Sequence, residues 1–233
     1  MSPALIGRYR LIAALAFGVL GGEAAAASEI ERFRTLAIDA PAAVRSSAPA
    51  RELSAAELVT ELRKGGYVLF FRHTATNHDE NDDRARSLTD CANQRGLSAK
   101  GRTDAAAIGR AFAELGIPVA KVLTSPICRA NETARLIFGK GDVSLALIGD
   151  PDFASADPRR YQQLSALFVT PQRAGDNLAL TSHGNPFRAV AGPPHLAEGE
   201  MAVIRSKDGD FEIVARVRPD GWAAITSTVG KAR

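Results

Sequence analysis

Uninterrupted apolar runs alternate along the chain with segments in which apolar residues recur every three or four positions. The run Tyr67–Phe71 contains no polar residue, which is typical of a strand buried on both faces. Before it, Ser54 and Glu57 have the spacing of a capping box, and Gly65-Gly66 can end a helix in a left-handed turn. We therefore expect ordered structure to begin near residue 54 with a helix and then a strand.

The same alternation continues toward the C-terminus. The further predicted helices are Gly101–Leu115, Cys128–Phe138 with Pro126 at its first position, and one opened by Asp157-Pro158; the further strands are Val119–Thr124, Ser144–Ile148 and Asn177–Ser182. Met201–Arg205 and Phe211–Val217 flank an Asp-Gly pair and are predicted to form a hairpin. Strands that alternate with helices predict a three-layer α/β/α sandwich with a mostly parallel sheet.

The N-terminal segment has the three-part pattern of a secretory signal peptide. Arg8 and Arg10 precede the apolar run Leu11–Leu20, and small residues follow up to Ala27. A membrane anchor is the alternative, but this run is shorter than the roughly 20 residues that a spanning helix needs. We expect cleavage after Ala27 and a periplasmic or secreted protein with no stable membrane anchor.

The expected organisation is a signal peptide over residues 1–27, a flexible leader over 28–53 and one catalytic domain over 54–233. The leader is rich in Ala, Ser and Pro and has no sustained hydrophobic period. The signal segment contains two Arg and one Glu, so its removal lowers the net charge from +3 to +2. This charge does not indicate a nucleic-acid partner.

The chain has two cysteines, Cys91 and Cys128. An oxidising compartment allows a disulfide between them if their Cα atoms lie close enough. The alternative is that Cys128 is a reactive nucleophile, which we favour less because no His stands beside it in the sequence.

Polar residues follow three of the predicted strands. Arg72 and His73 come after the first strand, Arg129 shortly after the second, and His183 after the last. In open parallel sheets the carboxyl ends of the strands form the ligand site, so two imidazoles and two guanidiniums can converge there. Guanidiniums bind phosphate oxygens and an imidazole can attack phosphorus, which is chemistry that needs no metal or other cofactor.

Four sequence elements together resemble the histidine phosphatase superfamily, which includes the cofactor-dependent phosphoglycerate mutases and many acid phosphatases. The elements are Arg72-His73-Thr74, Leu97-Ser98-x-x-Gly101, Ser125-Pro126-x-x-Arg129-Ala-x-Glu132-Thr133-Ala134 and Ser182-His183-Gly184-Asn185. The resemblance spans most of residues 67–218 and implies a phosphoglycerate mutase-like fold. It also implies that His73 becomes phosphohistidine and that Arg72, Arg129 and His183 hold the phosphoryl group.

The chain departs from the family pattern after the first motif. Thr74 stands where the family often has Gly, and Ala75-Thr76-Asn77 replaces the polar signature of the mutases. This difference disfavours mutase activity. Asn77 is a candidate phosphate contact, with a turn-forming role as the alternative.

A phosphatase also needs an acid that protonates the leaving oxygen. In many relatives this acid lies between the third and fourth motifs, which points to Asp152 in preference to Asp150. Glu198 and Glu200 are the other candidates. Turn shaping is the alternative role for the two aspartates.

Several other polar residues have solvated loops as their default interpretation. This group contains His78 with the acidic run after it, His195, and the arginines Arg84, Arg86 and Arg95. The alternatives are a weak cation site at the acidic run, a place for His195 at the mouth of the pocket, and arginines that add charge for an anionic substrate. The sequence as a whole predicts an exported phosphatase of small phosphomonoesters. The alternatives are a phosphotransferase or mutase, or an inactive module that binds a phosphate ligand.

Overall fold

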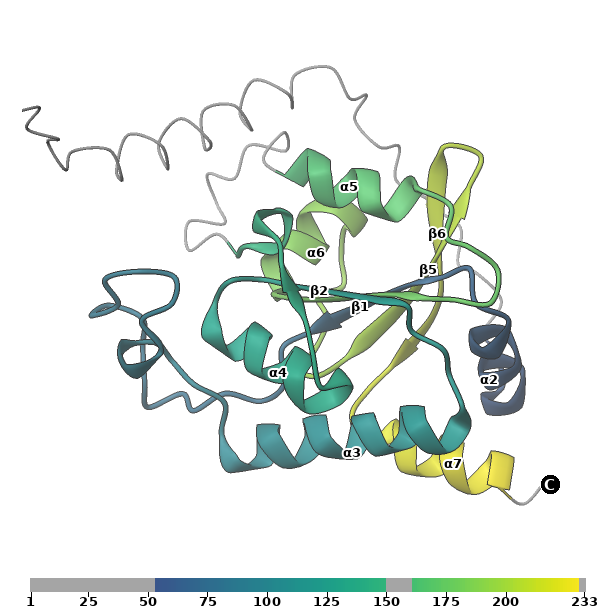
Figure 1. Ribbon diagram of the computed structural model, residues 1–233, viewed down its shortest axis with the longest axis horizontal. Coiled ribbons are helices and arrows are strands. Elements are labelled where there is room, and N and C mark those ends of the chain that lie inside the picture. Colours follow the sequence, from purple (N-terminus) through teal and green to yellow (C-terminus); the bar gives the residue numbers. More distant parts are fainter. Residues whose placement is uncertain (1–52, 150–160, 231–233) are drawn as a thin grey trace, which may run out of the picture. The chain divides into compact units, whose positions relative to one another are not determined.

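The computed structural model describes residues 53–149 and 161–230, and they contain a six-stranded sheet covered by helices on both faces (Figure 1). The strand order is β3-β2-β4-β1-β5-β6. The strands are β1 (Val68–Arg72), β2 (Lys121–Thr124), β3 (Asp142–Val143), β4 (Leu178–Ser182), β5 (Met201–Lys207) and β6 (Asp210–Val217). The first four strands in this order run parallel, and β5 and β6 are antiparallel additions at one edge. The predicted fold class is confirmed.

The helices form the two outer layers. They are α2 (Ala55–Lys64), α3 (Ala99–Leu115), α4 (Cys128–Phe138), α5 (Gln162–Val169), α6 (Gly184–Ala191) and α7 (Gly221–Gly230). In Figure 1, α3 and α7 lie on one side of the sheet, while α5 and α6 lie on the other. The sequence analysis did not predict α6 or α7.

The strand β1 lies at the centre of the sheet and its side chains enter two separate hydrophobic clusters. Leu69 and Phe71 belong to the cluster that α2, α3 and α7 cover, whereas Val68 and Phe70 belong to the cluster that α5 and α6 cover. Because both faces of the strand are buried, its residues Val68–Phe71 are all apolar and show no alternation. The strand thereby holds Arg72 and His73 at a fixed place at its carboxyl end.

Local sequence signals account for several element boundaries. Ser54 caps α2, with its side chain accepting from the N–H of Glu57 and the Glu57 carboxylate accepting from the N–H of Ser54, as the capping box predicts. Asp208 and Gly209 both have positive φ in the β5–β6 turn, which is the conformation that an Asp-Gly hairpin turn needs.

Two predictions differ from the structure, and others lie outside the residues that it describes. The strand predicted over Ser144–Ile148 is wrong, because only Asp142–Val143 pairs with β2 and Leu145–Leu147 forms a 3-10 turn. The three residues of this turn are Leu, Ala and Leu, which have no β-branch and are compatible with a helical turn. Pro126 is also not the first helical residue, since α4 begins at Cys128 with Ile127 as its N-cap. The helix predicted at Asp157-Pro158, the signal segment 1–27 and the leader 28–53, apart from Leu53, lie outside the described residues.

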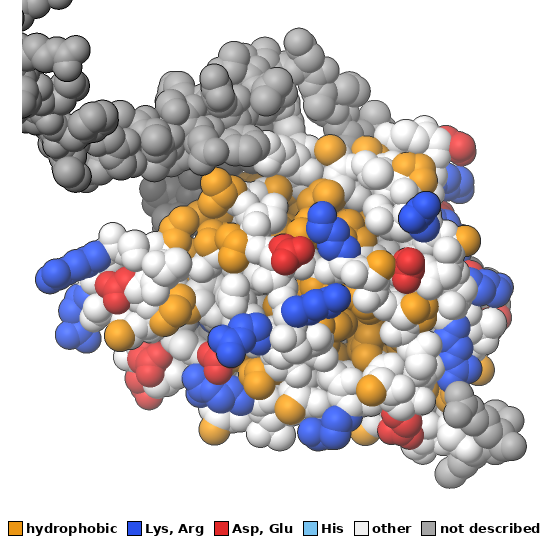
Figure 2. Space-filling model, in the orientation of Figure 1, with side chains coloured by type: hydrophobic (Ala, Val, Ile, Leu, Met, Phe, Trp, Pro, Cys, Tyr) orange, Lys and Arg blue, Asp and Glu red, His pale blue; other side chains and the backbone are white. Residues whose placement is uncertain are grey.

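The described surface carries charges of both signs. On the face in Figure 2, Lys and Arg side chains lie among Asp and Glu side chains, with small apolar areas between them. Within residues 53–149 and 161–230, no helix is both long enough and apolar enough to cross a membrane.

Candidate functional site

His73 lies immediately after β1 and is almost completely buried, with 2% of its surface exposed. Its backbone N–H donates to the carbonyl oxygen of Ser182 over 2.9 Å, which fixes it beside the end of β4. The ring Nδ1 lies 3.0 Å from the carbonyl oxygen of Thr74. A carbonyl oxygen only accepts, so Nδ1 carries the proton and Nε2 keeps its lone pair. Nε2 is therefore the nitrogen that can act as a nucleophile.

The surroundings of His73 keep its ring neutral. Burial is the main cause that lowers the pKa of His73 to about 3, and the positive charges of Arg129 and Arg72 act in the same direction. The hydrogen bond to Thr74 and the charge of Glu198 oppose this shift but do not outweigh it. A neutral imidazole at physiological pH is the form that attack on phosphorus requires.

His183 follows β4 and faces His73 with a distance of 5.4 Å between the ring centroids. Its Nε2 lies 2.9 Å from the hydroxyl oxygen of Ser125, at the end of β2. Burial, followed by the electrostatic interaction with the neighbouring His73 and the charge of Arg129, lowers the pKa of His183 well below its ordinary value. The ring is thus a neutral polar group, and the permanent positive charge of the site comes from the arginines.

Arg72 and Arg129 flank this pair of imidazoles. Arg72 donates to the carbonyl oxygen of Leu196 over 2.9 Å and lies 3.5 Å from a carboxylate oxygen of Glu198. One terminal nitrogen of Arg129 contacts both carboxylate oxygens of Asp82, at 3.0 and 3.1 Å, and the side chain of Arg129 is 11% exposed. The Nε atoms of Arg72 and Arg129 are buried and have no hydrogen-bond partner among the described residues. Each arginine therefore keeps donor capacity for an anion.

These four side chains line one cavity of about 980 Å³. The carboxyl ends of β1 and β4 and the start of α4 form one side of it, and the loop from Asn77 to Arg95 forms another. The lining residues are Arg72, His73, Asn81, Asp82, Asp83, Ala85, Arg86, Ser87, Leu88, Gln94, Arg95, Ile127, Arg129, Ile148, Gly149, His183, Gly184, Asn185 and His195. The convergence that the sequence predicted for Arg72, His73, Arg129 and His183 is present in the structure.

Hydrogen bonds join the sequence elements around this cavity. The backbone N–H of Thr74 donates to the hydroxyl of Thr133 over 3.2 Å, which connects the first element to the third. Arg102 bridges the second and third elements by donating to the carbonyl oxygen of Leu97 over 2.6 Å and to Glu132 over 2.7 Å. Thr74, which stands where the family often has Gly, is fully buried. Its hydrogen bond to Thr133 supports the site.

Two glycines of these elements allow close contacts. A Cβ atom on Gly101 would collide with the carbonyl oxygen of Ala75, so the start of α3 can approach that backbone only with glycine. A Cβ on Gly184 would lie 2.8 Å from Nδ1 of His195. The absence of a side chain at Gly184 therefore lets His195 reach the cavity wall, which corrects the expectation that His195 belongs to an ordinary surface loop.

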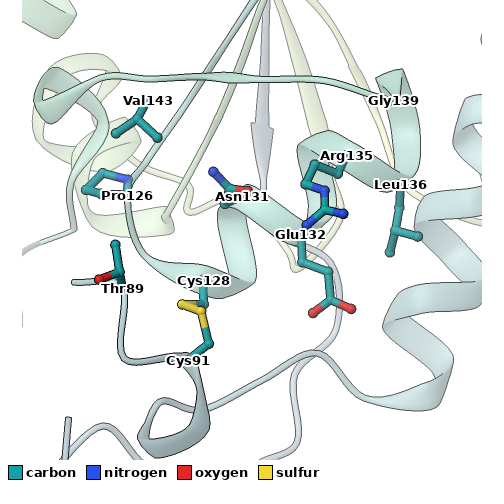
Figure 3. Close-up of a pocket in the computed structure, with 10 residues that line it drawn as sticks. All are labelled: Thr89, Cys91, Pro126, Cys128, Asn131, Glu132, Arg135, Leu136, Gly139 and Val143. Atoms are coloured by element: carbon teal, nitrogen blue, oxygen red, sulfur yellow. A yellow bond between two sulfur atoms is a disulfide. The ribbon is translucent and has the colours of Figure 1, made fainter. Parts of the chain in front are cut away.

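A disulfide ties the loop from Asn77 to Arg95 to the start of α4. Cys91 and Cys128 are bonded, with their Cα atoms 5.6 Å apart (Figure 3). The side-chain oxygen of Gln94 also accepts from the N–H of Cys128 over 3.0 Å. The outer side of the disulfide borders a second hollow of about 620 Å³ along α4, which contains none of the four converging residues. The disulfide makes Cys128 unavailable as a free nucleophile.

The candidate acids have different surroundings. Asp152 and Asp150 lie outside the described residues. Glu200 pairs with Arg216 at 3.0 Å and accepts from the N–H of Ala197, so it has a structural role. Glu198 lies 4.0 Å from Nδ1 of His73, on the side away from the nucleophilic Nε2.

The protonation state of Glu198 also makes it a poor proton donor. Burial raises its pKa, but hydrogen bonds from Thr76, the electrostatic interaction with His73 and the charge of Arg72 outweigh burial, so the pKa is lowered overall. A carboxylate that stays ionised beside Arg72 is suited to orienting the guanidinium. Glu198 is therefore a positioning residue in this geometry.

Asn77 takes the turn-forming role that was the alternative to phosphate binding. Its amide oxygen accepts from the N–H of Asp79 over 3.2 Å and its amide nitrogen donates to Glu80 over 3.0 Å. Asn77 is also not among the residues that line the cavity. The sequence analysis missed Asp82 as the partner of Arg129, since nothing in an acidic run indicates which carboxylate turns inward.

In the part of the chain that the structure describes, no group of three or more His, Cys, Asp or Glu side chains could hold a metal ion. The basic groups around His73 are instead guanidiniums, which bind phosphate directly.

Comparison with protein families gives one match, in which the model of the histidine phosphatase superfamily (branch 1) covers residues 68–167. This range contains the first three sequence elements, and the fourth follows it at Ser182. No curated protein matches the chain.

Solved structures with similar folds have low sequence identity to the chain. They include the protein histidine phosphatase SixA complexed with tungstate (17% identity, TM-score 0.46, covering 66% of this chain and 97% of that one). A phosphoserine phosphatase from Entamoeba histolytica in complex with phosphoserine has 10% identity, a TM-score of 0.48 and coverages of 66% and 98%. A mycobacterial glucosyl-3-phosphoglycerate phosphatase with inorganic phosphate has 15% identity, a TM-score of 0.49 and coverages of 66% and 99%. Over residues 68–167 the chain is thus similar to the histidine phosphatase superfamily, and the fourth sequence element follows this range.

Proposed function

We propose that this protein is a phosphatase that hydrolyses small phosphomonoesters through a phosphohistidine formed on His73. The observation that carries the proposal is the geometry of His73, a buried neutral imidazole whose Nδ1 is held by Thr74. Arg72, Arg129 and His183 line the same cavity and surround it with donors for the oxygens of a phosphoryl group.

In the first step, Nε2 of His73 attacks phosphorus, the P–N bond forms and the bond to the leaving oxygen breaks. The phosphoryl oxygens gain charge-assisted hydrogen bonds from Arg72 and Arg129, which are already oriented by Glu198 and Asp82. The leaving oxygen takes a proton from an acid, for which Asp152 remains our candidate. In the second step, water attacks phosphorus, the P–N bond breaks and inorganic phosphate leaves.

The test is detection of the intermediate. The protein is incubated with a simple aryl phosphate at about pH 5 to 6 without added metal, quenched in base, and searched by mass spectrometry for acid-labile phosphate on His73. We expect phosphate on His73 together with steady release of the aryl alcohol. His73→Asn should abolish both signals, whereas the matched variant His78→Asn should keep them.

The same experiment separates the alternatives. A folded protein that forms no phosphohistidine and shows no turnover, yet is stabilised by phosphate against unfolding, would be the inactive binding module. Transfer of the phosphoryl group to an added alcohol in preference to water would identify a phosphotransferase.

We also propose that the protein acts outside the cytoplasm after cleavage behind Ala27. The basic, apolar and small-residue pattern of residues 1–27 supports this, and so does the Cys91–Cys128 disulfide, because such bonds persist in oxidising compartments. Cell fractionation and N-terminal sequencing test it, with Ser28 expected as the first residue. An intact N-terminus in a cytosolic fraction would contradict the proposal.

A further inference from the structure

Four guanidinium groups line the cavity, and two of them, those of Arg86 and Arg95, have no acidic side-chain partner among the described residues. Arg86 is exposed, whereas Arg95 is partly buried. Arg72 lies beside Glu198 and Arg129 beside Asp82, whereas no ion pair or side-chain hydrogen bond joins Arg95 to another residue of 53–149 or 161–230. Its Nε atom is buried without a hydrogen-bond partner. Unpaired buried donors are costly in a folded protein, so this side chain is suited to receive an anion from outside.

The arginines are close enough to repel each other. The charge of Arg95 is among the causes that lower the pKa values of Arg72, of Arg129 and of His183, after burial as the main cause. Asp82 does not neutralise Arg95, because its carboxylate accepts from the backbone N–H of Arg95 over 2.7 Å and from the guanidinium of Arg129. Arg72 and Arg129 are neutralised by Glu198 and Asp82, whereas the positive charge of Arg95 has no carboxylate partner among the described residues.

The cavity is also larger than one phosphoryl group needs. A volume of about 980 Å³ is in the range of pockets that hold whole small molecules. Arg72 is the last residue of β1 and Arg129 follows the end of β2, whereas Arg95 belongs to the loop that forms another side of the cavity. An anionic group on the leaving part of a substrate would therefore meet Arg95 while the reacting phosphate meets His73.

We propose that Arg95 binds a second anionic group of the substrate, a carboxylate or a second phosphate carried by the leaving group. This inference rests on the proposed phosphatase function. The preferred substrates are then phosphomonoesters with at least one further negative charge. A guanidinium can make two parallel hydrogen bonds to either kind of group.

Three aryl phosphates of similar shape test the proposal. In 4-carbamoylphenyl phosphate the substituent is neutral, in 4-carboxyphenyl phosphate it is a carboxylate, and in 4-(phosphonomethyl)phenyl phosphate it is a non-hydrolysable phosphate analogue. We expect the parent protein to prefer at least one anionic substrate over the neutral one by about ten- to hundred-fold in kcat/KM, the usual gain from a hydrogen bond to a charged group. The preferred anionic substrate distinguishes a carboxylate from a phosphate.

Arg95→Gln should remove this preference, and the readout is the ratio of kcat/KM between anionic and neutral substrates in the same variant. The matched control is Arg84→Gln, in the same loop but outside the cavity lining, which should keep the ratio of the parent. A parent without preference, or an Arg95→Gln variant that keeps it, overturns the inference while turnover of the neutral substrate still supports the phosphatase. Absence of turnover with all three substrates would count against the proposed function itself.

Discussion

The Nδ1 atom of His73 lies 3.0 Å from the carbonyl oxygen of Thr74, and this contact decides which nitrogen of the ring is free. Thr74 is in turn held by Thr133 of α4 through its backbone N–H. The orientation of His73 therefore depends on residues of two separate sequence elements that meet only in the fold.

The first prediction concerns the isomer of phosphohistidine. Because Nδ1 donates to Thr74, phosphorylation should occur at Nε2 alone. The two isomers differ in their nitrogen and phosphorus NMR spectra, so a quenched and base-stabilised sample can be assigned directly. Phosphate at Nδ1 would show that the ring is oriented the other way during catalysis.

The second prediction concerns Arg129. Arg129→Lys keeps the charge but loses the planar fork that contacts Asp82 with one nitrogen and leaves others for phosphate. We expect kcat/KM for an aryl phosphate to fall by about one to two orders of magnitude, the loss of one or two charge-assisted hydrogen bonds. Arg135→Lys, on the exposed side of the same helix, is the control and should retain the activity of the parent. Equal activity of the two variants would remove Arg129 from the site.

The third prediction concerns the disulfide. Cys91 and Cys128 are 37 residues apart, so the bond closes a long loop and lowers the conformational entropy of the unfolded chain. This should raise the free energy of unfolding by about 3 to 4 kcal/mol. The loop that it anchors lines the cavity, so KM should rise in Cys91→Ser as well. Chemical denaturation and steady-state kinetics measure the two effects.

The variants Cys128→Ser and the double substitution provide the control for this prediction. All three should have the same stability in oxidising buffer, because each removes the same bond. Additive losses from the single substitutions would mean that the two thiols act separately.

The fourth prediction concerns pH. His73 has a pKa of about 3 in the folded state against an ordinary value of 6.5, so between these values the unfolded chain binds more protons than the folded one. The resulting destabilisation is absent above about pH 6.5 and grows as the pH falls, by up to about 1.4 kcal/mol per pH unit. The melting temperature should therefore drop on acidification from about pH 7 to about pH 4.5, and less so in His73→Gln.

The comparison variant for this prediction is His78→Gln, whose side chain is 71% exposed in the parent. On acidification its melting temperature should fall by more than that of His73→Gln, because it keeps the buried His73. If His73→Gln and the parent lost stability in parallel, the neutral state of His73 would not be supported.

The fifth prediction concerns Gly101. In Gly101→Ala the new methyl group meets the carbonyl oxygen of Ala75, so α3 must shift away, at a cost of roughly 1 to 3 kcal/mol. Gly230→Ala is the matched control, because a Cβ there meets no atom within 4 Å. Denaturant titrations of both variants should give a loss for the first and no loss for the second. A neutral effect of Gly101→Ala would mean that the start of α3 is looser than the structure shows.

Most of the fold could be predicted because its signals are local. The buried run before His73, the capping box at Ser54 and the Asp-Gly turn each depend on residues that are neighbours in the sequence. The predicted strand at Ser144–Ile148 failed for the complementary reason. A short apolar run is compatible with a strand or a turn, and only its packing selects between them.

The alternation of strands and helices in the sequence is enough to place four polar side chains at strand ends on one edge of the sheet, where they meet: Arg72, His73, Arg129 and His183. The groups that surround these side chains could not be predicted, because they come from segments far apart in the chain. The pairing of Arg129 with Asp82, and the lack of an acidic partner for Arg95 among the described residues, depend on the path of the loop from Asn77 to Arg95, which has no hydrophobic period in the sequence. His195 reaches the cavity wall from the segment after α6. Burial and electrostatic interactions across that loop are set by distances between residues far apart in the chain, and no local pattern encodes such distances.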